Sequence, residues 1–96
     1  MEKITCTIGD DFDRGVYVVI EFDGERFTVD GYDDEEGTLD DVPVDFDLDG
    51  DPAIVAARCV EAAQEWCLER AVKYERATGR RFIAAVEAAT KGKVRE

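Results

Sequence analysis

Apolar residues recur at every second position in three stretches of the first half of the chain. A two-residue period is typical of strands that bury one face and expose the other. The stretches therefore predict three strands with buried faces formed by Ile4, Cys6 and Ile8, by Val16, Val18, Ile20 and Phe22, and by Phe27 and Val29.

Asp23 and Gly24 lie between the second and third stretches and predict a two-residue hairpin turn. A type I′ turn requires positive φ angles, which glycine adopts easily. Folding the chain there places the apolar residues of both strands on the same side of the sheet. The expected cross-strand pairs are Ile20 with Phe27, Val18 with Val29 and Glu21 with Arg26.

Residues 42–48 repeat the alternation and predict a fourth strand. Pro43 suits the start of a strand or an edge position, because proline cannot donate a hydrogen bond to a neighbouring strand. We expect Val44, Phe46 and Leu48 on the apolar side and Asp45, Asp47 and Asp49 on the outer face.

The second half changes to the period of an amphipathic helix. Asp51 suits the N-cap and Pro52 the first helical position, and Gly79 is expected to end this long helix in the left-handed conformation. A shorter helix over residues 80–90 should follow it. The expected buried positions are Ala56, Cys59, Val60, Ala63, Trp66, Cys67, Ala71 and Tyr74 in the first helix, and Phe82, Ile83, Val86 and Ala89 in the second.

These elements predict one α+β domain spanning residues 1–96. The expected fold is a four-stranded antiparallel meander, followed by one long and one short helix packed on one face. In such a meander the loops after the first and third strands emerge at the same end of the sheet.

Charge is divided unevenly along the chain, which has a net charge of −12. Residues 1–51 contain 18 acidic and 3 basic residues, whereas residues 52–96 contain 6 and 9. The negative charge disfavours direct binding to nucleic acid or to an anionic membrane and favours a basic protein as partner.

The predicted topology gathers many of these carboxylates at one end of the sheet. Aspartates on alternate positions of the fourth strand would recur at about 6.7 Å, which is close to the rise of every second phosphate along one DNA strand, about 6.8 Å. The expected partner-binding residues are Asp10, Asp11, Asp13, Asp33, Asp34, Glu35, Glu36, Asp40 and Asp41 at that end, with Asp45, Asp47 and Asp49 on the strand.

The sequence contains no histidine, serine or asparagine. Serine–histidine–aspartate triads, cysteine–histidine pairs and histidine-based zinc sites are therefore excluded, and no cofactor motif is present. We predict that the protein is not an enzyme. Cys6, Cys59 and Cys67 are expected to be reduced and buried, and the absence of a signal peptide or a long apolar run indicates a cytoplasmic protein.

An alternative is a calcium site. Asp45, Asp47, Asp49 and Gly50 resemble the start of an EF-hand loop. The resemblance ends at Pro52, and at Ala56, where an EF-hand has a bidentate glutamate.

In size, acidity and lack of catalytic residues, the chain resembles small acidic phage proteins of the anti-CRISPR and DNA-mimic type. This likeness of composition implies an inhibitor of a basic, nucleic-acid-binding target in the bacterial cytoplasm. An immunity protein or antitoxin that caps a basic toxin is the alternative within the same binding class, and a small calcium-binding module is the alternative outside it.

Overall fold

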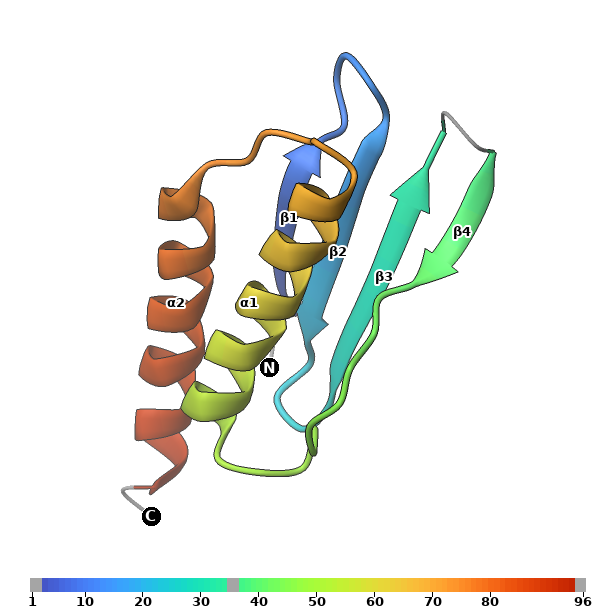
Figure 1. Cartoon of the computed structure of the whole chain (residues 1–96). Coiled ribbons are helices and arrows are strands. Elements are labelled where there is room, and N and C mark those ends of the chain that lie inside the picture. The colour runs from blue at the N-terminus through green and yellow to red at the C-terminus, as the bar shows by residue number, and fades with distance from the viewer. Residues whose placement is uncertain (1–2, 35–36, 95–96) are drawn as a thin grey trace.

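The computed structural model describes residues 3–34 and 37–94. An antiparallel sheet with the strand order β1-β2-β3-β4 precedes two helices, which lie side by side over one face of it (Figure 1). The predicted α+β class, with an antiparallel sheet followed by two C-terminal helices, is confirmed. The elements are β1 (Ile4–Asp10), β2 (Val16–Phe22), β3 (Phe27–Asp33), β4 (Thr38–Asp41), α1 (Pro52–Glu69) and α2 (Arg76–Val94).

The core lies between the helices and the apolar face of the sheet. Helix α1 packs across β1, β2 and β3, whereas α2 packs against α1 and β1. The alternation in β1 and β2 is confirmed, because their inward side chains are almost completely buried except Ile4, which is half-buried. Trp66 is 2% exposed and belongs to this core, as predicted. Cys6, Cys59 and Cys67 are buried free thiols, which is also as predicted.

The β2–β3 hairpin has a longer turn than predicted. Ile20 pairs with Val29 and Phe22 pairs with Phe27, so the register differs by two residues from the expected one. Asp23 explains the longer turn, because its Oδ1 accepts hydrogen bonds from the N–H groups of Glu25 and Arg26, both at 2.8 Å. The longer turn also lets the rings of Phe22 and Phe27 stack, with their centroids 4.3 Å apart.

The expected cross-strand pair of Glu21 with Arg26 is wrong for the same reason. In the observed register Glu21 lies opposite Thr28, and its carboxylate contacts Lys3 Nζ at 3.2 Å instead. An even shift leaves each residue on its own face of the sheet. The predicted faces therefore hold although the predicted pairs do not.

The fourth strand lies earlier in the sequence than predicted. Strand β4 is Thr38–Asp41 and pairs with β3, whereas residues 42–51 form an irregular connection to α1. Pro43 lacks the N–H group that a ladder needs, and the Asp47 side chain accepts the N–H of Asp49 at 2.8 Å, which favours a turn over a strand.

The start of α1 was predicted correctly, but its end was not. Asp51 caps the helix by accepting the N–H of Ala53 at 3.0 Å, and Pro52 is the first helical residue. The helix ends at Glu69, and the residue in the left-handed conformation is Ala71, with a φ of 55°.

Gly79 lies within α2, which has 19 residues and is not the shorter helix. A Cβ atom at this position would lie 2.5 Å from Val60 Cγ1 of α1. Glycine therefore serves close packing between the two helices here, and does not serve as a helix cap.

Candidate functional site

Two loops and the end of α1 come together at one end of the molecule (Figure 1). The β1–β2 loop covers residues 11–15, and the chain turns from β3 to β4 at the same end. The N–H of Asp34 donates to the carbonyl of Gly15 at 3.0 Å, which joins the two loops. We call this region, with Asp10, Asp11, Asp13, Asp33 and Asp34, the acidic end.

The structure places only some of the nine predicted carboxylates at this end of the sheet. Five form the acidic end as defined above, while Glu35 and Glu36 lie outside the described residues. In β4, Asp40 lies opposite Gly31 and Asp41 opposite Asp30. The strand therefore leads these two residues away from the loops.

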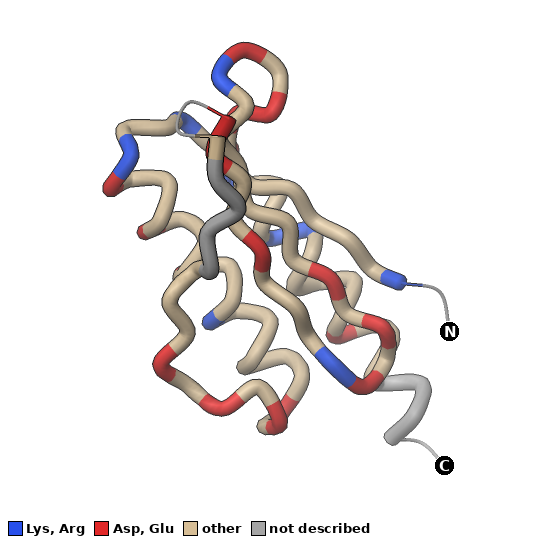
Figure 2. The backbone as a smooth tube through the Cα atoms, turned by 90° about the vertical axis from the view of Figure 1, so that its right-hand side faces the viewer, with Lys and Arg blue, Asp and Glu red and all other residues tan. Residues whose placement is uncertain are grey.

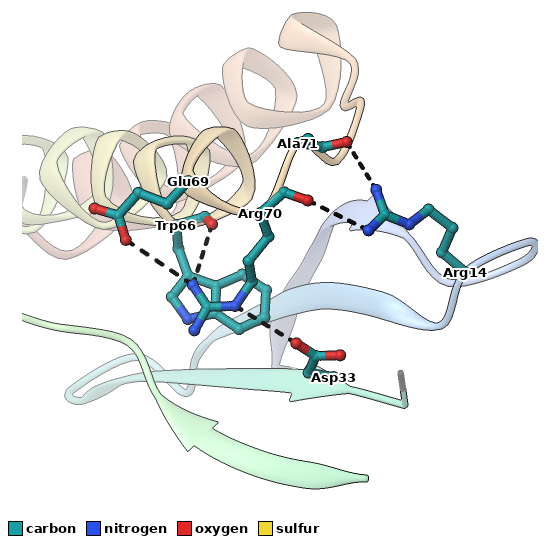
Figure 3. Close-up of polar contacts among 6 residues, drawn as sticks. All are labelled: Arg14, Asp33, Trp66, Glu69, Arg70 and Ala71. Atoms are coloured by element: carbon teal, nitrogen blue, oxygen red, sulfur yellow. Dashed lines mark hydrogen bonds and ion pairs between the residues drawn. The ribbon is translucent and has the colours of Figure 1, made fainter. Parts of the chain in front are cut away.

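Asp33 was predicted to be a partner-binding residue, but its side chain is buried and only 6% exposed. Arg70 Nε lies 3.6 Å from Asp33 Oδ2, and the Arg70 guanidinium carbon lies 3.9 Å from the centre of the Trp66 ring (Figure 3). The pair compensates the buried carboxylate, and the indole face adds a cation–π contact. Asp33 is therefore a structural residue.

Sequence reasoning missed Arg70, although two signals pointed to it. Asp33 has the same strand parity as Phe27 and Val29, which places it on the inward face. Arg70 follows Trp66 by four residues, so the two side chains share one face of the helix. An inward carboxylate in such a sheet needs a cation from the element that covers it.

Arg14, the basic residue of the β1–β2 loop, is bound to the end of α1. Its Nη1 donates to the carbonyl of Ala71 at 2.7 Å, and its Nη2 donates to the carbonyl of Arg70 at 3.3 Å (Figure 3). The negative end of the helix dipole stabilises a cation at this position. Arg14 thus attaches the β1–β2 loop to the helix.

The outer part of the β1–β2 loop is negative and contains an exposed aromatic residue. Asp11 and Asp13 are exposed, and neither forms an ion pair with another described residue. Phe12 lies between them and is 93% exposed. Sequence reasoning missed Phe12, because a single apolar residue in a loop is common on protein surfaces and gives no signal by itself.

Asp45, Asp47 and Asp49 do not extend this surface, contrary to the prediction. They are exposed, but they lie in the connection to α1 and not on a strand. Figure 2 shows the acidic positions of this connection and those of the β1–β2 loop toward opposite ends of the molecule. Because residues 42–51 are not a strand, these three aspartates do not have the regular spacing of alternate strand residues. The predicted match to the phosphate spacing of DNA is therefore wrong.

Two kinds of chemistry find no support in the described residues. Among the residues whose side chains the structure describes, no group of three or more cysteine, aspartate or glutamate side chains is arranged to hold a metal ion. Burial raises the pKa of Cys6, Cys59 and Cys67 to about 11. Their thiols are therefore protonated at neutral pH and are poor nucleophiles.

In the part of the chain that the structure describes, neither helix combines the length and apolar character needed to cross a membrane. Comparisons with protein-family models, with curated proteins and with solved structures found no match to this chain.

Proposed function

We propose that this chain is a non-enzymatic binding protein whose acidic end binds and inhibits a basic, nucleic-acid-binding protein. The observation that carries the proposal is the division of the charges at this end. Arg14 contacts the end of α1, and Arg70 contacts Trp66 and Asp33. Asp11 and Asp13 face solvent without an ion pair to any described residue, so this surface presents negative charge to a partner.

The acidic end is also held together by hydrogen bonds of its own. Asp10 Oδ1 accepts the N–H of Phe12 at 3.2 Å and that of Asp13 at 2.9 Å. Together with the Asp34–Gly15 hydrogen bond and the Arg14 contacts, these interactions fix the loop before a partner arrives. A preorganised loop loses less conformational entropy on binding.

The charge of the whole chain supports the same class of partner. A net charge of −12 repels nucleic acid but attracts a groove lined by lysine and arginine. Opposite charges also speed association. In line with the compositional resemblance to anti-CRISPR and DNA-mimic proteins, the proposed target is a CRISPR effector, another defence nuclease or a DNA-binding regulator in the bacterial cytoplasm.

The test is binding to a panel of purified basic proteins over a series of salt concentrations. The panel contains a guide-loaded Cas9-type effector, an OB-fold single-stranded-DNA-binding protein and a helix-turn-helix repressor. We expect tight binding to at least one protein, weakening as salt rises, competition by its nucleic acid, and inhibition of its activity.

A matched pair of variants locates the surface. Asp11→Asn with Asp13→Asn, and Asp45→Asn with Asp49→Asn, each remove two exposed negative charges, at opposite ends of the molecule. The first pair should weaken binding by about tenfold or more, and the second by about threefold at most, through long-range electrostatics. Equal effects of the two pairs, or binding that ignores both salt and nucleic acid, would overturn the proposal.

A further inference from the structure

Phe12 is the most exposed large apolar residue among those whose side chains the structure describes. It is 93% exposed, compared with 57% for Ile54 and 65% for Leu68. The other two lie on α1, whereas Phe12 lies in the β1–β2 loop. Its ring is thus almost entirely available to a partner.

The structure holds Phe12 in this exposed position. On one side, the Asp10 carboxylate binds the N–H groups of Phe12 and Asp13. On the other side, Arg14 binds the carbonyls at the end of α1. Gly15, with a φ of 66°, completes the loop in a conformation that favours glycine. The loop therefore presents its aromatic residue and does not fold it inward.

The residues beside Phe12 give the exposed ring its chemical character. Asp11 and Asp13 flank it and are both exposed. An aromatic ring between two anionic groups has the same chemical order as an unstacked nucleotide, in which a base lies between two phosphates. The flanks of Leu68 and Ile54 lack this arrangement, because neither residue lies between two acidic neighbours.

We propose that the β1–β2 loop imitates an unstacked nucleotide, with Phe12 in the place of the base and Asp11 and Asp13 in the place of the flanking phosphates. This inference rests on the proposed function and names the kind of site that the partner offers. Proteins that hold unstacked bases stack them on aromatic side chains and bind the backbone in a positively charged groove. The aromatic side chains of such a site match Phe12, and its positively charged groove matches Asp11 and Asp13.

The partner is therefore a protein that binds single-stranded or extruded bases, and the loop occupies its base-binding pocket. A protein that reads only the grooves of an intact duplex offers phosphate-binding cations without a pocket for a base. The single-stranded-DNA-binding protein and the guide-loaded effector of the panel represent the first kind, and the helix-turn-helix repressor represents the second.

The decisive variant is Phe12→Ala, with Phe12→Trp as the conservative exchange. Ile54→Ala is the control for an exposed apolar residue, because Ile54 lies in the first turn of α1, away from the acidic end. We expect Phe12→Ala to weaken binding by about tenfold or more, as for an aromatic residue at the centre of an interface. Phe12→Trp should retain binding within about threefold, because a larger ring also stacks, and Ile54→Ala should leave it unchanged. A single-stranded oligonucleotide should compete better than a blunt duplex.

Because Phe12 is so exposed, its removal should not unfold the protein, and equal melting temperatures of Phe12→Ala and the parent check this. Nucleotide mimicry is overturned if Phe12→Ala binds like the parent, if only the duplex-binding repressor is bound, or if no panel protein is bound at low salt. If Phe12→Ala is silent but the Asp11→Asn, Asp13→Asn pair still weakens binding, nucleotide mimicry fails alone and the proposed function stands. If neither exchange nor salt matters, both fail.

Discussion

Arg70 connects three parts of the molecule through one side chain. It lies over Trp66 of α1, pairs with the buried Asp33 of β3, and provides one of the carbonyls that Arg14 binds. Removing a cation beside a buried carboxylate costs more than the pair itself contributes, because the remaining charge is left in a medium that solvates it poorly.

We therefore expect Arg70→Met to destabilise the fold by about 2–4 kcal/mol. The double variant Arg70→Met, Asp33→Asn should recover about 1 kcal/mol or more of this loss, because it also removes the buried charge. Urea unfolding of the parent, both single variants and the double variant gives the coupling free energy between the two residues in a double-mutant cycle. Additive losses would show that Asp33 and Arg70 are not coupled.

The cysteines give a prediction on pH. Burial raises the pKa of Cys6, Cys59 and Cys67 to about 11 from the ordinary thiol value of 9.0. Below pH 9 the thiols are neutral in both the folded and the unfolded chain, whereas above it the unfolded chain releases protons first. The resulting contribution to stability is present below pH 9 and is lost as the pH rises toward 11.

Thiol reactivity measures this directly. At about pH 8, Ellman's reagent should react slowly with the native protein and rapidly once urea has unfolded it, since the thiolate is the reactive form. Stability should also fall between the two pKa values. A thiol that reacts at once in the native protein would mean that it is more accessible than its burial implies.

At the scale of the elements, the sequence patterns predicted faces better than pairings or ends. The two-residue period identified the buried sides of β1 and β2. It did not fix the turn at Asp23, because the carboxylate that bonds Glu25 and Arg26 lengthens the loop without changing the faces. The same period in residues 42–48 predicted a strand where Pro43 and the Asp47 hydrogen bond favour an irregular chain.

The site itself was predicted only in outline. The loops after β1 and β3 do meet at one end of the sheet, as a meander requires. The roles of Asp33 and Arg70 depend on how α1 lies over the sheet, and this is a long-range contact that local periodicity does not contain. For the same reason, the position of Asp45, Asp47 and Asp49 at the opposite end could not follow from alternation alone.

Ala71 at the end of α1 and Gly79 within α2 provide a matched pair of exchanges with opposite signs. Ala71 holds a left-handed conformation, and the N–H groups of Ala71 and Val72 close the end of α1 on the carbonyls of Leu68 and Cys67. Ala71→Gly should stabilise the protein by about 0.5–1 kcal/mol, because glycine adopts this conformation without strain. Gly79→Ala should destabilise it by about 1–2 kcal/mol through overlap with Val60.

Urea unfolding measures both exchanges, and Val60→Ala serves as the partner of the second. In the Val60→Ala background, Gly79→Ala should cost much less, because the methyl groups that it meets are gone. If Gly79→Ala stabilises the parent protein, as its better helix propensity alone would predict, the helices are not as closely packed as the distance to Val60 indicates.

At the scale of the whole molecule, the acidic residues form more than one group. The acidic end and the connection before α1 lie toward opposite ends of the structure (Figure 2). Repulsion within each group still opposes folding, because the chain has a net charge of −12. Salt screens repulsion of this kind over about 10 Å at moderate concentration.

The melting temperature should therefore rise by a few degrees, roughly, between about 10 mM and about 300 mM NaCl. Calorimetry at neutral pH measures the change. The Asp11→Asn, Asp13→Asn pair should show a smaller rise than the parent, since it has less charge to screen. A flat response would mean that the carboxylates are too dispersed to repel one another measurably.

Arg14 joins the β1–β2 loop to the two residues that follow α1, Arg70 and Ala71, through hydrogen bonds to their backbone carbonyls. A partner that immobilises the loop therefore also restrains the helix end, away from the contact surface. In hydrogen–deuterium exchange, the amides of Ala71 and Val72 should become more protected when a partner binds the loop. Local opening at the helix end requires Arg14 to break its hydrogen bonds to the two carbonyls, and a bound partner would oppose this. Mass spectrometry of this segment would then report occupancy of the loop without a label on the interface, and Arg14→Met should abolish that signal.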